Sequence, residues 1–147
     1  MRLVTHVLFT MGLIALLLTY YSVPISAMAV FVPMAGVIQM FIDAIGHTRN
    51  HGYVHRTWVT HDLILSLLTV VAPFTYVLVW MNEPLLTSLI TATASLYSHL
   101  MLDYMTGGLF ILTRRIHGLG IEYDNPVANG LFTLIGVVML AYVFIYK

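Results

Sequence analysis

Histidine and aspartate side chains are the groups in this sequence best suited to chemistry, and several of them are one helical turn apart. His99 and Asp103 are separated by four residues, as are Asp43 and His47, so each pair would share one face of a helix. Imidazole and carboxylate groups together are common ligands of zinc and other divalent ions. The spacing therefore favours a metal site, although a single pair of this kind is also typical of hydrogen-bonded packing.

The composition narrows the chemistry further. Seven histidines contrast with a single lysine and no cysteine. Without cysteine, disulfides and thiolate metal ligands are excluded. The six basic and six acidic residues balance, so no excess of positive charge indicates binding to nucleic acid.

The elements that must position these groups are membrane-spanning helices. The 147 residues are 60% hydrophobic and only 8% charged, whereas soluble domains carry about 25% charged residues. A chain this short could not bury so much apolar surface in a core of its own. We therefore expect one domain, residues 1–147, that forms an all-α integral membrane helical bundle. About five segments are long enough to cross a bilayer, with four as the alternative: 3–21, 24–45, 60–81, 84–105 and 127–146.

The first segment could pass for a secretory signal, because an apolar run follows Arg2 and small residues surround Met28. We expect it to be retained as a transmembrane helix. Five spans then place all seven histidines on the membrane face that holds the N-terminus. The same face receives five of the six basic residues: Arg2, Arg49, Arg56, Arg114 and Arg115. By the positive-inside rule, this face is predicted to be cytoplasmic.

Several polar residues have ordinary explanations. His51 and His117 fit interfacial positions, although a helix that continued beyond residue 47 would align His51 with His55. Asp62 suits the start of a helix, where the dipole favours negative charge. The adjacent arginines of the second long loop are typical topology determinants at a phospholipid surface. The sequence assigns no role to Asn129.

Four stretches of the sequence resemble a family of small membrane-bound metal-dependent hydrolases, whose signature strings are of the type HRxxTHS and SHLxLD. The resemblance is closest to a short archaeal branch of uncharacterised proteins, and it covers most of the chain. More distantly, the pattern is similar to the zinc-dependent phospholipase C and P1 nuclease superfamily. The stretches that carry it are Thr5-His6, Asp43, His55-Arg56-Thr57-Trp58-Val59-Thr60-His61 and Ser98-His99-Leu100-Met101-Leu102-Asp103.

The resemblance implies five metal ligands, because the order of the superfamily motif is matched in full. These are His6, Asp43, His61, His99 and Asp103. The chain also departs from the pattern: Asp62 replaces the family serine, the N-terminus lacks the tryptophan whose amine is a ligand in the superfamily, and the downstream His-x-x-x-Glu pair is missing. One or two divalent ions, with zinc as the first choice, therefore fit better than three.

The same resemblance implies a hydrolase that acts on phosphoester bonds. A divalent ion lowers the pKa of bound water toward about 7 and so supplies a nucleophile. We expect Arg56 to hold phosphate, because its planar fork matches phosphate oxygens, and His55 and His47 to support the ligands or to carry protons. A site at the headgroup level of the cytoplasmic leaflet would act on lipid headgroups.

Other functions compete with this hypothesis. The chain could be a non-catalytic membrane scaffold, or a carrier of metal ions or protons. Histidines on facing helices also ligate haem in electron-transfer proteins, but the neighbouring aspartates have no role there. Membrane lipid is the expected partner, nucleic acid is not, and a homo-oligomer is left open because much of a small bundle's surface faces lipid or neighbouring copies.

Overall fold

The computed structural model describes residues 1–50 and 53–146, so His51 and Lys147 lie outside the described residues. Helices account for most of the chain, which confirms the all-α class. The helices are α1 Leu3–Tyr20, α2 Ile25–Gly46, α3 Trp58–His61, the π-helical turn η1 Leu67–Val71, α4 Ala72–Trp80, α5 Leu85–Thr106 and α6 Pro126–Tyr146. The strands are β1 His47–Asn50, β2 Tyr53–Arg56, β3 Leu109–Ile111 and β4 Arg114–Ile116.

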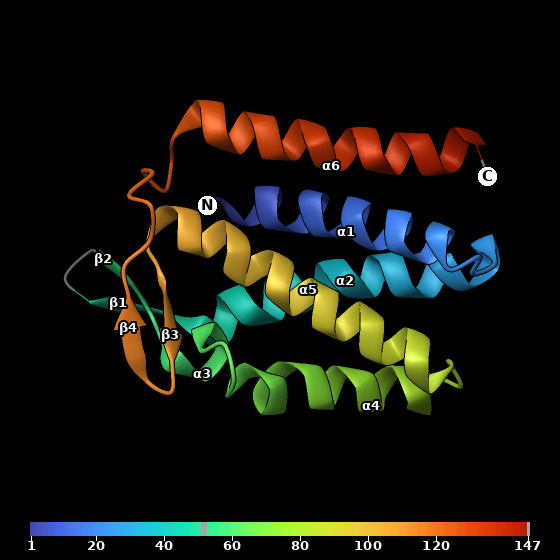
Figure 1. Ribbon diagram of the computed structural model, residues 1–147, viewed down its shortest axis with the longest axis horizontal. Coiled ribbons are helices and arrows are strands. Elements are labelled where there is room, and N and C mark those ends of the chain that lie inside the picture. The colour runs from blue at the N-terminus through green and yellow to red at the C-terminus, as the bar shows by residue number, and fades with distance from the viewer. Residues whose placement is uncertain (51–52, 147) are drawn as a thin grey trace.

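The long helices lie side by side in a bundle, and both hairpins sit at one end of it, near the N-terminus (Figure 1). Helix α1 packs against α2, α5 and α6, while α4 packs against α5. Helix α6 is peripheral, since its buried residues are Asn129, Gly136 and Val143. The end of the bundle that carries the hairpins therefore collects the start of α1 and the ends of α2 and α5.

Four of the helices, α1, α2, α5 and α6, are long and apolar enough to cross a membrane. The third expected span, over 60–81, is interrupted. Its apolar part, Leu67–Trp80, is too short at about 1.5 Å per residue to cover about 30 Å of hydrocarbon. The break follows Asp62, whose Oδ1 accepts the backbone N–H groups of Ile64 and Leu65 and so caps a new turn. The alternative of four full spans therefore fits the described residues better than five.

The segment after α2 is a β-hairpin and not a continued helix. Strands β1 and β2 pair antiparallel, with His47 opposite Arg56 and Thr48 opposite His55. The helix ends at Gly46, whose carbonyl accepts the backbone N–H of Thr57 at 2.7 Å. The helical alignment of residues beyond 47 is therefore wrong, and His55 is exposed at the hairpin.

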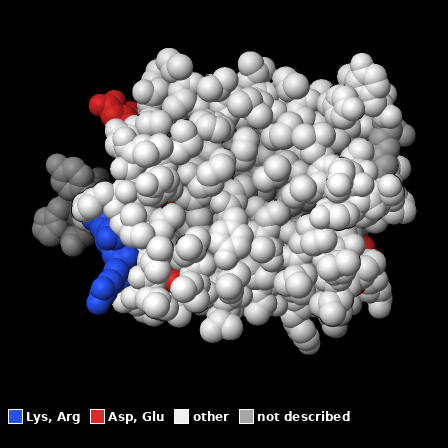
Figure 2. Space-filling model, in the orientation of Figure 1, with Lys and Arg blue, Asp and Glu red and all other residues white. Residues whose placement is uncertain are grey.

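Apolar side chains fill the space between the helices and also cover the outside. One core cluster centres on Ile14, Leu18 and Phe31, and a second on Ile42 and Leu96. Helices α1 and α6 approach closely, because a Cβ at Gly12 would overlap the backbone of Gly136. In Figure 2 the basic side chains gather at the hairpin end and the wide middle of the face carries no charge, as lipid contact requires.

Candidate metal centre

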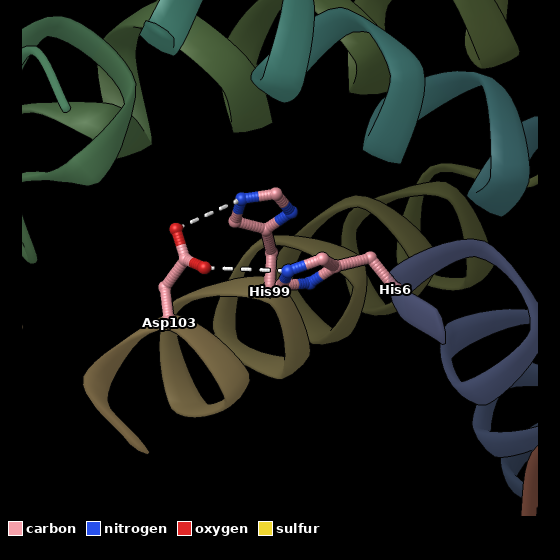
Figure 3. A group of neighbouring side chains, drawn as sticks. All are labelled: His6, His99 and Asp103. Carbon is pink, nitrogen blue, oxygen red and sulfur yellow. Dashed lines mark ion pairs between the residues drawn. The ribbon is translucent and has the colours of Figure 1, made fainter. Parts of the chain in front are cut away.

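Asp103 is the centre of a buried polar cluster at the hairpin end of the bundle. It lies in the last turn of α5, one turn after His99, and His6 approaches it from the start of α1 (Figure 3). Nε2 of His6 is 3.3 Å from Oδ1 of Asp103, and Nε2 of His99 is 3.4 Å from Oδ2. All three residues are 0% exposed. Two helices thus bury three ligand-type groups at one point.

His61 reaches the same carboxylate from α3. Its Nε2 is 2.9 Å from Oδ2 of Asp103. The approach depends on Gly46 at the end of α2, because a Cβ there would overlap Oγ1 of Thr60 and the ring of His61. Burial lowers the pKa of His61 to about 4, although Asp103 opposes this shift. The imidazole is therefore neutral near pH 7, the form that ligates metal ions.

Gln39 determines which nitrogen of His99 carries hydrogen. The amide Nε2 of Gln39 donates to the carbonyl of Ser95 at 2.8 Å, so its Oε1 faces Nδ1 of His99, also at 2.8 Å. An amide oxygen only accepts hydrogen bonds, so Nδ1 of His99 must donate. In a neutral ring, Nε2 then presents its lone pair toward Asp103. Such a partner behind the ring is typical of metal-ligating histidines.

Thr60 does the same for His61 with a hydroxyl group. Its Oγ1 donates to the carbonyl of Ile42 at 3.4 Å and lies 3.0 Å from Nδ1 of His61. Because the hydroxyl proton is committed to Ile42, Oγ1 accepts from Nδ1 of His61. The Nε2 lone pair of His61 is therefore also turned toward Asp103.

The imidazole nitrogens that face Asp103 are the least satisfied polar atoms of the cluster. Nε2 of His6, His61 and His99 are buried and have no hydrogen-bond partner among the described residues. A buried imidazole nitrogen without a partner is costly. Lone pairs of His61 and His99 face the carboxylate of Asp103, and such acceptors repel each other unless a cation or a proton lies between them. The donor set of imidazoles and one carboxylate fits a divalent metal ion.

The ligand atoms form two groups that share Asp103. One group comprises His6, His99 and Asp103, and the other comprises His47, His61 and Asp103. Within each group the ligand atoms lie within 4.8 Å of one another. A buried group of this composition could hold a metal ion.

Arg56 closes the cluster from the second strand of the hairpin. Its Nε and Nη2 donate to Oδ2 and Oδ1 of Asp103 at 2.7 and 2.8 Å, and Nη2 also donates to Oγ1 of Thr106. Its Nη1 lies against Gly107, where any Cβ would overlap it. The amino group of Met1 is 3.5 Å from Oδ1 of Asp103. The guanidinium of Arg56, which was expected to hold phosphate, is thus hydrogen-bonded to the carboxylate of Asp103.

Comparisons with known proteins place the chain in a family without an assigned function. Residues 1–102 match the family described as "Protein of unknown function (DUF1286)". The chain belongs to this family. No curated protein and no solved structure matches it. The DUF1286 match includes His6, His61 and His99 and ends one residue before Asp103. It agrees with the expectation of an uncharacterised family and adds nothing for or against the hydrolase resemblance, which stays a prediction.

The structure brings four of the five expected ligands of this DUF1286 protein together and gives the fifth a different place. Oδ1 of Asp43 is 3.1 Å from Nδ1 of His47, and Asp43 belongs to neither ligand group among the described residues. His47, expected to support the ligands, is the nearer residue, with Nε2 4.0 Å from Oδ2 of Asp103. His47 takes the place expected for Asp43 because α2 ends at Gly46. His47 is therefore the first residue of β1, and its ring points toward Asp103.

The remaining expected residues lie farther out. His55 and His117 are exposed and join neither ligand group, and His51 is outside the described residues. Gln39 was missed by the sequence reasoning, although an amide within an apolar span is itself a signal of an internal partner. Asn129 ties α6 to α1, because its Oδ1 accepts the hydroxyl of Thr5 at 2.9 Å.

Proposed function

We propose that this protein is a membrane-embedded metal-dependent hydrolase that cleaves phosphoester bonds, with lipid headgroups as its substrates. The observation that supports this proposal is the convergence of buried imidazole nitrogens on Asp103 without hydrogen-bond partners. The resemblance to the SHLxLD and HRxxTHS strings of membrane-bound hydrolases points to the same reaction class, although this chain has three residues between Arg56 and Thr60 where the second string has two. Neither fold nor family assigns the reaction.

The residues of the cluster have distinct parts in this proposal. The imidazoles of His6, His99 and His61 would hold one or two ions, with Asp103 as the shared carboxylate. Zinc is the first choice, because nitrogen and oxygen ligands of this kind are common in catalytic zinc sites. A bound divalent ion supplies Lewis acidity and lowers the pKa of a water ligand. Arg56 and Gln39 fix the orientation of the carboxylate and of one imidazole.

The position of the cluster supports the choice of substrate. It lies where α1 begins and α2 and α5 end, beside the hairpins that carry Arg56, Arg114 and Arg115. Residues at helix ends of a membrane bundle lie at the level of lipid headgroups. By the positive-inside rule, the arginine-rich end faces the cytoplasm. Phosphodiester groups of the inner leaflet would then be within reach without extraction of the lipid.

Metal analysis tests the proposed centre directly. The protein, purified in detergent without chelator, is expected to contain about one or two equivalents of a divalent metal, zinc first. His61→Ala and Asp103→Asn should lose metal, while His117→Ala, at an exposed position, should retain it. Equal metal contents in all four proteins, or none in any, would contradict the centre.

Hydrolysis is tested on the same proteins with phospholipid vesicles. The metal-loaded wild type should release a phosphorylated headgroup or phosphate, and His61→Ala should not. Metal binding without cleavage would favour a carrier or scaffold. A Soret band in the visible spectrum of the purified protein would show bound haem and would contradict the hydrolase proposal.

A further inference from the structure

A small polar cavity lies next to the Asp103 cluster and shares Arg56 with it. Its volume is about 60 Å³, several times the roughly 10–15 Å³ that one water molecule needs. Its lining residues are His55, Arg56, Gly107, Gly108, Phe110 and Arg115. The cavity is therefore large enough for a small polyatomic ion but not for a drug-sized ligand.

The charged side chains that line the cavity favour an anion over a cation. Arg115 and Arg56 are basic, His55 carries an imidazole, and none of the described lining residues is acidic. Arg56 is already paired with Asp103, which leaves Arg115 as the cation whose charge no carboxylate in the lining offsets. The planar guanidinium of arginine binds phosphate oxygens in pairs. The lining thus fits a phosphate group.

The cavity is also tied mechanically to the candidate metal centre. The backbone N–H groups of Gly107 and Gly108 donate to the carbonyl of Asp103 at 2.9 and 3.1 Å. Gly108 has a φ of +91°, and a Cβ there would overlap the carbonyl of Ile116. In the β3–β4 hairpin, Phe110 pairs with Arg115. A close turn therefore joins the β3–β4 hairpin, which carries Arg115, directly to the end of α5 where Asp103 lies.

Asp62 holds the other side of this hairpin. Its Oδ2 accepts the backbone N–H of Thr113 at 2.7 Å, and the N–H of Leu63 donates to the carbonyl of Phe110 at 2.8 Å. Arg115 is thus carried on a hairpin that is anchored at both α5 and the break after α3. Such anchoring is what preorganised binding of a ligand requires.

We propose that this cavity is an oxyanion subsite, in which Arg115, assisted by His55, binds the phosphate group of the substrate beside the Asp103 centre. The assignment rests on the proposed function in one respect, because it takes the bound oxyanion to be the phosphate of the scissile ester. The same phosphate chemistry is offered by a lipid headgroup and by a soluble monoester. Arg56 lies between the two sites and contacts both.

A calorimetric titration with inorganic phosphate tests the subsite. The full chain is kept in detergent and is treated with chelator before the titration. Wild type is expected to bind phosphate. Arg115→Gln should weaken the affinity about tenfold, the equivalent of one charge-assisted hydrogen bond. Arg114→Gln is the matched control, because Arg114 is the preceding residue on β4 and does not line the cavity. It should leave the affinity within about twofold of the wild type, as expected for loss of a solvent-screened surface charge.

Two results would overturn the subsite. One is the absence of phosphate binding to the chelator-treated wild type. The other is an equal loss in Arg114→Gln and Arg115→Gln, which would indicate general surface charge. Because the assay uses protein without metal, its outcome is separate from that of the metal analysis. Phosphate binding to a protein that never binds metal would leave the subsite standing and remove the proposed hydrolase.

The source of the phosphate is distinguished in nanodiscs. If a lipid headgroup occupies the subsite, phosphatidic acid in a phosphatidylcholine bilayer should compete with inorganic phosphate for wild type and not for Arg115→Gln. Competition of this kind supports the subsite with a lipid substrate. Phosphate binding that phosphatidic acid leaves unchanged overturns the lipid assignment and supports a soluble phosphoester at the same subsite.

Discussion

The ring of His6 stacks on the ring of His99, with centroids 4.1 Å apart and an angle of 21° between the ring planes. The two residues come from α1 and α5, which are far apart in the sequence, and both rings aim Nε2 at Asp103 (Figure 3). The Nε2 of His99 presents a lone pair to the carboxylate of Asp103, a contact that is favourable only with a cation or a proton between the two acceptors. The stack therefore links the packing of two helices to metal binding.

Replacement of His6 by phenylalanine separates these two roles. His6→Phe keeps an aromatic ring against His99 but removes Nε2 from the group formed by His6, His99 and Asp103. If Asp103 bridges two ions, the metal content should fall by about one equivalent while the second group retains its ion, and thermal unfolding should change little. Elemental analysis and tryptophan fluorescence measure the two effects. His117→Phe, at an exposed site, is the control, and an unchanged metal content in His6→Phe would exclude this ligand.

Gly46 offers a test that leaves every ligand in the sequence. A methyl group in Gly46→Ala would overlap the ring of His61 and Oγ1 of Thr60 and so displace the imidazole from Asp103. Because misplaced ligands or supporting groups typically cost about 10–100-fold in metal affinity, zinc titration should show a loss of that order. Gly130→Ala is the matched control, since, apart from the adjacent backbone of its own helix, nothing lies within 4 Å of a Cβ there. Equal affinities in the two variants would remove His61 from the ligand set.

Asp62 is expected to stabilise the fold rather than bind metal. Its carboxylate accepts the backbone N–H groups of Ile64, Leu65 and Thr113, so Asp62→Ala leaves backbone donors without a partner at the break after α3. Loss of a hydrogen-bond acceptor at a buried position typically costs about 1–3 kcal/mol. The variant should unfold at a lower temperature and retain its metal. Asp124→Ala, at an exposed position, should unfold like the wild type, and a drop in that protein too would remove the special role of Asp62.

The contribution of Asp62 should depend on pH in a defined direction. Burial acts to raise the pKa of Asp62, but the backbone N–H groups of Leu65, Thr113 and Ile64 more than offset it and hold the pKa below its ordinary value. The unfolded chain therefore binds the proton more readily than the folded one. The stabilisation is present in full above the unfolded pKa of about 3.9 and is lost as the pH falls through the lower folded value. The difference in stability between wild type and Asp62→Asn should be constant near neutral pH and narrow below about pH 4; a difference that grows in acid contradicts this.

Hydropathy determined much of the architecture. Segments near 3–21, 24–45, 84–105 and 127–146 became α1, α2, α5 and α6 with small shifts at their ends, because a lipid-facing helix must keep its backbone bonded within itself. The interruption of the span over 60–81 escaped this reasoning. The break after Asp62 is stabilised by a hydrogen bond from the backbone N–H of Thr113, which lies in the hairpin β3–β4, far away in the sequence. A local sequence pattern cannot predict a contact between such distant residues.

The sequence by itself determined that His6, His61, His99 and Asp103 lie near one end of the bundle, because helix length and chain direction fix the level of each residue in the membrane. Only the tertiary structure decided how they meet. The rotation of each helix about its axis depends on close contacts such as that of Gly46 with Thr60, and the ring orientation of His99 depends on Gln39, a residue 60 positions away. In the folded chain His47, and not Asp43, lies near Asp103, and Arg56 donates to the Asp103 carboxylate. Side-chain convergence is set by packing across helices, whereas depth in the bilayer is set by local composition.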